Sequence, residues 1–167
     1  MATGGYGDLE RPGSFTGTFE VSDAGLPVSV SIVVVNGTAY LQLPFSPFRE
    51  ADLSKYGFPN PVTLFDPRTG LSAAFRQTSR LSYTGTVDET GVTVWSIAGY
   101  VPDAAVSAAL DMSRFPVLVK VIYYINPPTG RLMSVSMTGP FYKGRPKTVV
   151  TITLSKYGER VPIRPPD

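Results

Sequence analysis

Alternating apolar and polar positions along several segments of the chain predict β-strands. From Val28 to Val34, valine and isoleucine at every second position alternate with Ser29 and Ser31. A strand directs successive side chains to opposite faces, so this alternation is typical of a sheet with one buried face. Asn36-Gly37 then favours a tight turn, and Thr38 to Leu43 resumes the alternation, which predicts a β-hairpin.

A second hairpin is predicted between Val117 and Thr138. β-Branched and aromatic residues fill Val117 to Ile125, turn residues occupy Asn126 to Gly130, and Met133 to Thr138 is again extended. Lys120 is the only charged residue of the first strand, so both faces of that strand require cover. A helix, a second sheet, a partner protein or a lipid is able to supply it.

The rest of the chain predicts further strands and two short helices. Asp66 and Asp103 are each placed to begin a helix, because aspartate is a favoured N-cap residue. Residues 1–13 are rich in glycine, and we expect a flexible lead-in there. Short helices cannot cover so wide a sheet, so a concave apolar face is left without cover. About seven or eight strands are expected in all, and the further ones cover Ser14–Ser22, Leu81–Val87, Val92–Tyr100 and Thr148–Leu154. Trp95 stands in the third of these strands, and we expect it in the core.

The segment from Pro44 to Pro61 differs from its surroundings. It holds four prolines and lacks periodicity, which predicts a long ordered loop with one helical turn near Glu50 to Lys55. Long loops in compact domains are usually functional or packed by their own side chains. We expect its aromatic residues to pack at the entrance of a cavity; these are Phe45, Phe48, Tyr56 and Phe58.

The composition excludes several classes of function. The chain has no cysteine and no histidine, which excludes disulfides, Ser-His-Asp and Cys-His catalysis and ordinary zinc sites. A net charge of +2 is too small to indicate binding to nucleic acid. We therefore expect neither an enzyme nor a cofactor or metal site. A length of 167 residues fits a single domain over residues 1–167.

The sequence contains no membrane-spanning segment and no signal peptide at its start. No run of apolar residues is long enough to cross a bilayer. The first residues, from Met1 to Gly7, have neither a basic region nor an apolar region. Two alternatives follow, an intracellular protein or a chain from which a leader has been removed.

Four segments, taken together, resemble one protein family. They are Val33–Tyr40, Asn60–Leu71, Ala98–Val106 and Thr153–Arg160, the last with a Pro-Pro tail. In order and spacing they are similar to the LppX/LprA/LprF/LprG family of mycobacterial and other actinobacterial cell-envelope lipoproteins. The resemblance covers roughly residues 7–167.

The resemblance implies a fold, a ligand and a location. The implied fold is mainly β with short helices, a curved antiparallel half-barrel whose concave face carries the helices around an apolar cavity. The implied ligands are acylated glycolipids, phospholipids or triacylglycerol, carried at the extracytoplasmic face of the membrane. Family members begin with a signal peptide, a lipobox cysteine, a helix and one or two strands, which this chain lacks. We therefore expect an N-terminally truncated domain, and membrane association rests on the resemblance.

These observations favour non-catalytic binding and transport of acylated lipids or glycolipids in the cell envelope. Burial of acyl chains contributes about 0.8 kcal/mol per methylene, so affinity does not require specific polar contacts. The alternative is a structural or protein-interaction module without a lipid ligand, whose apolar faces are filled by protein. The candidate cavity residues are Val28, Val30, Ile32, Val34, Ala39, Leu41, Val119, Val121, Tyr123, Met133, Val135, Met137, Val150 and Ile152.

Self-association is a further expectation. With no strand before it, the strand over Ser14–Ser22 is expected at a sheet edge, where unpaired backbone groups can pair with another chain. Neither proline nor lysine protects that edge. We therefore expect association through this N-terminal strand.

Overall fold

The structure is a computed structural model, and it describes residues 2–23, 26–56, 58–66, 68–89, 91–110, 117–141 and 147–166. Its described part consists mainly of antiparallel strands with few short helices, which confirms the predicted fold class. The chain divides into two compact units. Unit 1 comprises Met1–Leu64 and Glu159–Asp167, and unit 2 comprises Phe65–Gly158.

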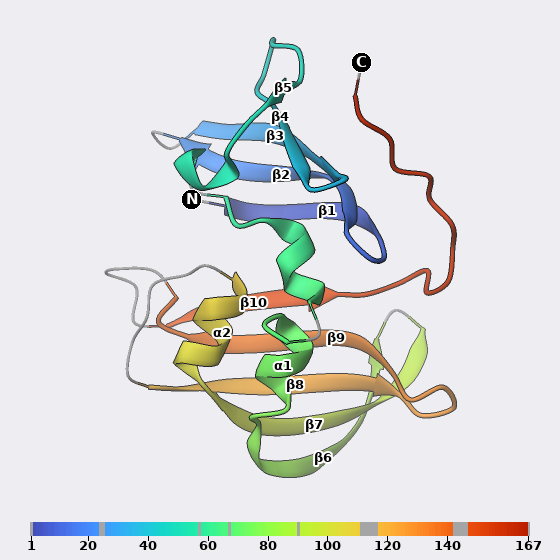
Figure 1. Cartoon of the computed structure of the whole chain (residues 1–167). Coiled ribbons are helices and arrows are strands. Elements are labelled where there is room, and N and C mark those ends of the chain that lie inside the picture. The colour runs from blue at the N-terminus through green and yellow to red at the C-terminus, as the bar shows by residue number, and fades with distance from the viewer. Residues whose placement is uncertain are drawn as a thin grey trace. The chain divides into compact units, whose positions relative to one another are not determined.

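Unit 1 contains a five-stranded sheet in which the strands lie side by side in chain order (Figure 1). The predicted turn at Asn36-Gly37 joins the third and fourth strands, and both residues have the positive φ angles, 52° and 80°, that such tight turns require. The elements are β1 (Ala2–Glu10), β2 (Ser14–Asp23), β3 (Leu26–Val35), β4 (Thr38–Gln42) and β5 (Arg49–Glu50), followed by the 3-10 helices η1 (Leu53–Tyr56) and η2 (Pro61–Phe65).

Strand β1 lies where the sequence predicted a flexible lead-in, and that prediction is wrong for Ala2–Glu10. Its glycines provide no alternating side chains by which to recognise a strand. Two of them, Gly5 and Gly7, are needed because the aromatic rings of β2 lie against them. A Cβ atom on Gly7 would be 2.6 Å from Cζ of Phe15, and one on Gly5 would be 2.7 Å from Cδ1 of Phe19.

Strand β2 is consequently not an edge strand. It pairs with β1 on one side and with β3 on the other, so the predicted exposed edge over Ser14–Ser22 is wrong. The error has the same cause, since β1 was not recognised from its glycines. The argument for self-association through β2 falls with it.

The core of unit 1 lies on one face of this sheet. Val30, Ile32 and Val34 of β3 point to it and are almost completely buried. Leu53 of η1 and Phe58 after it pack onto the same cluster, and the ring of Phe58 lies 6.1 Å from that of Phe19. The loop that follows β5 therefore closes the apolar face of its own sheet.

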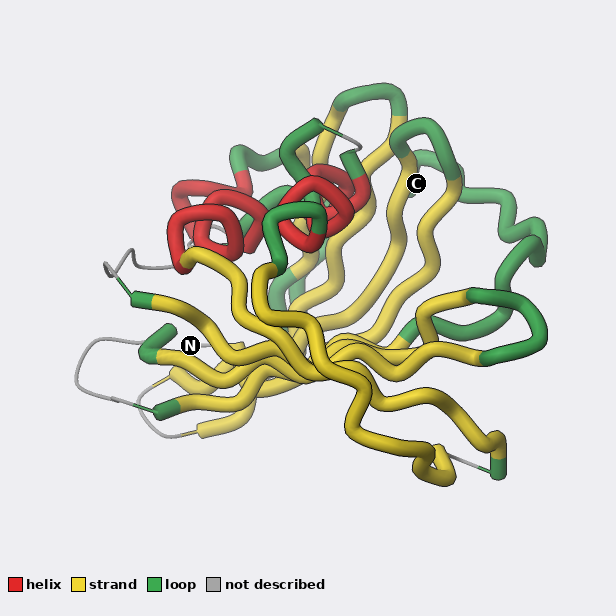
Figure 2. Tube along the Cα trace, turned by 90° about the horizontal axis from the view of Figure 1, so that it is seen from below, coloured by secondary structure: helices red, strands yellow, loops and turns green. Residues whose placement is uncertain are grey.

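Unit 2 contains a second five-stranded antiparallel sheet, ordered β10-β9-β8-β7-β6. Two α-helices lie against one face of it (Figures 1 and 2). The second helix begins at Asp103, as predicted. Asp66 lies in a turn before the first helix, where its carboxylate accepts hydrogen bonds from the backbone N–H groups of Arg68 and Thr69. The elements are α1 (Leu71–Phe75), β6 (Ser79–Glu89), β7 (Val92–Pro102), α2 (Asp103–Leu110), β8 (Leu118–Asn126), β9 (Arg131–Gly139) and β10 (Thr148–Thr153).

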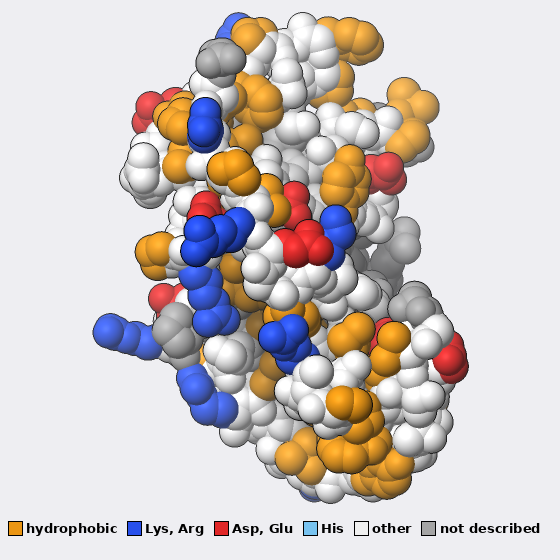
Figure 3. Space-filling model, turned by 90° about the vertical axis from the view of Figure 1, so that its right-hand side faces the viewer, with side chains coloured by type: hydrophobic (Ala, Val, Ile, Leu, Met, Phe, Trp, Pro, Cys, Tyr) orange, Lys and Arg blue, Asp and Glu red, His pale blue; other side chains and the backbone are white. Residues whose placement is uncertain are grey.

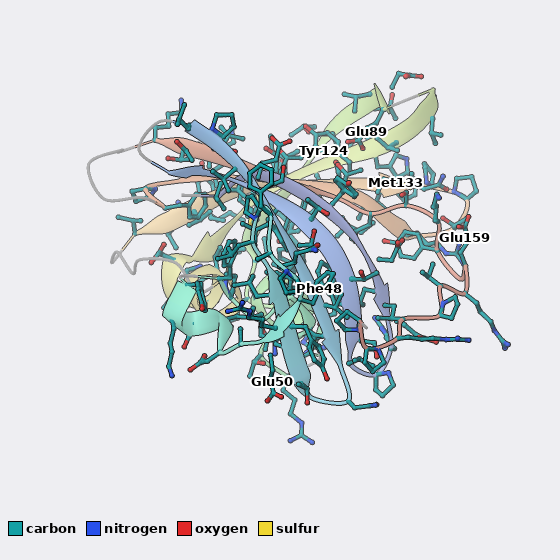
Figure 4. All side chains as sticks on the ribbon, turned by 90° about the horizontal axis from the view of Figure 1, so that it is seen from above. Phe48, Glu50, Glu89, Tyr124, Met133 and Glu159 are labelled. Carbon is teal, nitrogen blue, oxygen red and sulfur yellow. The ribbon has the colours of Figure 1, made fainter. Side chains whose placement is uncertain are left out.

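The hairpin of β6 and β7 bends over the face of the sheet that carries no helix. Glu89 ends β6, and β7 and β8 separate that strand from β9 in the sheet. The carboxylate of Glu89 nevertheless accepts a hydrogen bond from the hydroxyl of the fully buried Ser134 on β9. Figure 4 shows Glu89 in the same region as Tyr124 and Met133. The bend therefore buries part of this second face, including Val94 of β7.

Candidate functional site

The helix-bearing face of the sheet in unit 2 brings six of the sequence-predicted cavity residues into two rows. Strand pairing sets the rows, because residues opposite each other on neighbouring strands point to the same face. One row joins Val121, Met137 and Val150, and the other joins Tyr123, Val135 and Ile152. Val119 shares this face by alternation along β8. Met133 lies at an irregularity, since β9 shifts its pairing with β8 between Ser134 and Leu132.

Helices α1 and α2 close the part of this face that lies beneath them. Val119, Val121, Val135 and Met137 have no exposed surface. At the end of α1, the ring of Phe75 meets the ring of Tyr123 edge-on at 5.0 Å. A ligand can therefore touch the closed part only after α1 and α2 move away from the sheet.

Tyr123 marks the boundary of the closed part. Its hydroxyl group is hydrogen-bonded to that of Thr78, just after α1. Burial raises the pKa of Tyr123 above its ordinary value of 10.0, because it disfavours the phenolate. The phenol of Tyr123 therefore keeps its proton to a higher pH than an exposed tyrosine does, at the point where helical cover ends.

Beyond Tyr123 the same face continues as an exposed apolar surface. Trp95 of β7 lies opposite Ile125, one pair further along the face than Ile97 and Tyr123. Its side chain is 43% exposed, so the expectation that Trp95 belongs to the core is wrong. The reason is its place past the cover of α1, which the sequence of β7 does not reveal.

Strand β6 widens this surface at the edge of the sheet. Tyr83 lies opposite Ile97, and the Leu81 side chain lies against Gly99, within 3.2 Å of where a Cβ atom would be. Tyr83 and Leu81 are 59% and 61% exposed. We call Leu81, Tyr83, Trp95, Ile97 and Ile125 the open face. In the lower part of Figure 3, hydrophobic side chains lie exposed on the surface of unit 2.

The sequence predictions missed the open face. Trp95 and Ile97 stand at alternate positions of a predicted strand, and that spacing was the available signal. The missing information was the register of β7 on β8, which links them to Tyr123 and Ile125. The pairing of distant strands decides which alternating positions form one surface.

The six predicted cavity residues of unit 1 share one face, as their alternation indicated. They are Val28, Val30, Ile32, Val34, Ala39 and Leu41. Leu53 and Phe58 fill the space above them, and Val30, Ile32, Val34 and Leu41 are almost without exposed surface. In this conformation these residues form a packed core.

The four aromatic residues predicted at a cavity entrance do not come together. Phe58 belongs to the core of unit 1, and Phe45 is completely exposed. Tyr56 is exposed and Phe48 is partly buried. The predicted helical turn near Glu50 to Lys55 is present as η1.

Within the described residues, the structure contains no group of three or more acidic, histidine or cysteine side chains able to hold a metal ion. No helix of the described chain has the length and hydropathy needed to span a bilayer. The candidate site is accordingly an apolar surface, closed at one end by helices and accessible at the other.

Comparison with solved structures identifies the fold. The structure resembles that of LprF from Mycobacterium bovis with a TM-score of 0.73 and 17% identity, over 97% of this chain and 79% of that one. It also resembles LppX from Mycobacterium tuberculosis with a TM-score of 0.52 and 18% identity, over 98% of this chain and 87% of that one. At these identities the likeness shows a shared fold alone.

The family follows from the sequence comparison. No curated protein matches the chain. A family profile described as LppX_LprAFG lipoprotein matches residues 6–163, which is most of the chain. The chain therefore belongs to the LppX_LprAFG lipoprotein family.

Proposed function

We propose that this protein binds acylated lipids or glycolipids without transforming them and carries them within the cell envelope. The acyl chains would lie on the helix-bearing face of unit 2, with the open face as the first point of contact. Membership of a lipoprotein family supports this function, and so does the resemblance on which the sequence prediction rested.

One observation carries the proposal. The apolar face of the sheet in unit 2 is longer than the cover that α1 and α2 give it. Trp95 and Tyr83 are half-exposed, although the same face holds Val121 and Val135 with no exposed surface. Exposed apolar surface that continues a core is typical of an interaction site.

The energetics need no polar contact. Each methylene transferred from water to the sheet surface contributes about 0.8 kcal/mol, so a long acyl chain binds tightly if most of it is covered. The hydroxyl pair of Tyr123 and Thr78 lies at the inner limit of the open face. An acyl chain passing that limit would have to displace Phe75 and α1, which makes movement of the helices part of binding.

Trp95 is the only tryptophan of the chain, and it reports directly on this face. We expect its emission to shift to the blue when a single-chain or two-chain acyl lipid is added below its micellar concentration. Lipids brominated along the acyl chain should quench it. Native mass spectrometry of the purified protein, with extraction into organic solvent, should detect co-purified lipid.

A relocated reporter provides the control. In the double variant Trp95→Phe/Tyr6→Trp, the tryptophan stands at an exposed position of β1 in unit 1. Its emission should be unchanged by the same lipids. Unaltered Trp95 emission, together with protein free of lipid, would contradict the proposed function.

The alternative is a structural or protein-interaction module. The packing of unit 1 favours it, because Leu53 and Phe58 fill the face that was predicted to receive lipid. Under this alternative, the open face would be covered by another protein. Lipid titration separates the two, since only the lipid-binding function predicts a response of Trp95 to isolated lipid.

A further inference from the structure

The connection between β4 and β5 contains a firmly held turn that carries an exposed aromatic ring. The backbone N–H of Ser46 donates to the carbonyl of Leu43 at 3.1 Å, and its hydroxyl donates to the same carbonyl at 2.9 Å. The Nε2 of Gln42 donates to the carbonyl of Ser46 at 3.2 Å. With Pro44 at its second position, the turn is fixed before it meets any partner.

Phe45 occupies the third position of this turn with a φ of 61°. A β-turn with positive φ at its third position favours glycine or asparagine there, because an ordinary side chain is strained at positive φ. The side chain is 109% exposed, so it gains no packing in return. A strained residue without internal contacts points to a role at the surface.

The surroundings of Phe45 are uncharged, with apolar side chains in the turn and polar ones beside it. Residues 43–48 contain no charged side chain, and Leu43 is also exposed. A shallow groove of about 290 Å³ adjoins the turn, lined by Ser29, Ser31, Gln42 and Ser46 with residues 43–45. Exposed Arg49 and Glu50 follow and offset each other in charge.

We propose that the turn of residues 43–46 is a contact with the surface of a lipid bilayer. Leu43 and Phe45 would enter the boundary between headgroups and acyl chains, and the Ser and Gln side chains of the groove would meet the headgroups. A protruding ring with neutral polar groups beside it fits a fluid partner, which needs no preformed pocket. The turn belongs to unit 1 and the open face to unit 2, so the two share no residue and the contact does not depend on the proposed ligand site.

The charge of the turn determines the kind of membrane contact. Without a cluster of lysine or arginine, attraction to anionic lipid contributes little. Binding should therefore be similar for neutral and anionic vesicles and insensitive to salt. Two apolar side chains give weak, reversible binding, which orients the protein at the surface and does not anchor it.

The substitution Phe45→Asn separates membrane contact from folding. Asparagine tolerates positive φ, so the variant should keep or slightly raise the melting temperature. Flotation with vesicles of phosphatidylcholine should show a loss of about ten-fold in the partition coefficient, because the transfer of one large apolar side chain is removed. The matched control Tyr6→Asn removes an exposed aromatic ring from β1 and should float as the wild type does.

A second variant reads the contact directly. In Phe45→Trp/Trp95→Phe, the emission of the single tryptophan should shift to the blue with phosphatidylcholine vesicles and be quenched by lipids brominated near the headgroup. Equal flotation of Phe45→Asn and wild type, or absence of flotation by wild type, would overturn the proposal. Self-association of the wild type in the absence of vesicles, if Phe45→Asn abolished it, would also overturn the proposal and would favour a protein partner. Co-purified lipid, measured separately in Phe45→Asn, should be unchanged.

Discussion

The two sheets have the same topology but differ in how completely their apolar faces are covered. Each has five antiparallel strands that follow one another in chain order. In unit 1, the residues after β5 return over the sheet, and Leu53 and Phe58 complete its core. In unit 2, α1 and α2 cover one part of the face and leave Trp95 and Tyr83 exposed.

The difference shows that alternation along strands does not determine whether a face becomes a core or a site. The segment that packs over the sheet determines whether the face becomes a core or stays exposed. A loop with large side chains at the right spacing closes the face, whereas two short helices end before the face does. The predictions below test this difference at single residues.

The largest effect is expected at Met137, which is completely buried under the helices of unit 2. Met137→Ala should lower the free energy of unfolding by about 2–5 kcal/mol, because it removes packed methylenes and leaves a void. Trp95→Ala, on the exposed part of the same face, should lower it much less. Chemical denaturation of both variants measures the difference.

This expectation reverses the one from the sequence, in which Trp95 was the core residue and Met137 faced a ligand. Equal losses for the two variants would contradict the distinction between the closed part and the open face. The lipid titration of Trp95 described above sharpens the same distinction without altering stability.

An intermediate effect is expected in unit 1, at the glycines beneath the aromatic rings. A Cβ atom on Gly17 would lie 2.6 Å from Cζ of Phe15 and would also meet the carbonyl oxygen of Tyr6. Gly17→Ala should therefore lower the free energy of unfolding by about 1–3 kcal/mol, as overpacking does. Thermal denaturation measures it.

Gly4→Ala is the matched control, because no atom lies within 4 Å of a Cβ atom placed there. It should be neutral or slightly stabilising, since alanine restricts the unfolded chain. Similar losses for Gly4→Ala and Gly17→Ala would mean that strand flexibility, and not contact with Phe15, explains the glycines.

The smallest effect concerns Tyr123. Its raised pKa means that the folded state holds the phenol proton more tightly than the unfolded state, whose pKa is about 10. This stabilisation is complete below pH 10 and is lost as the pH rises through the folded pKa. Below pH 10, Tyr123→Phe should lower the free energy of unfolding by about 1 kcal/mol, because the hydrogen bond to Thr78 is lost. Above pH 10, the free energy of unfolding should fall less steeply with pH in the variant than in the wild type, because the variant lacks this phenol.

Melting temperatures of Tyr123→Phe and wild type at pH 8 and above pH 10 test this sign. Burial also raises the pKa of Tyr157, so a part of the alkaline loss should remain in the variant. Identical pH dependence in the two proteins would show that Tyr123 does not titrate differently in the folded state.

Alternation was sufficient to predict most strands and the shared face of Val28, Val30, Ile32 and Val34. It failed for β1, because glycine has no side chain to alternate and the reason for the glycines lies in Phe15 and Phe19 of the next strand. The aromatic residues of the non-periodic segment from Pro44 to Pro61 were expected at an entrance, but Phe58 belongs to the core of unit 1, because the sequence does not reveal which sheet a loop packs against. The open face needed the register of three strands, which local patterns do not carry.

The order of strands in both sheets has a consequence for how the chain assembles. Every described strand pairs only with strands adjacent to it in sequence, although α2 stands between β7 and β8. A hairpin with a tight turn, such as β3 and β4, closes a short loop and forms on a time scale of about 1–10 μs. No strand has to wait for a distant partner during synthesis. Glu159–Asp167 nevertheless belong to unit 1, so this unit is complete only after all of unit 2 has been synthesised. A chain ending at Gly158 would retain the ten strands that the structure describes and lack Glu159–Asp167 of unit 1.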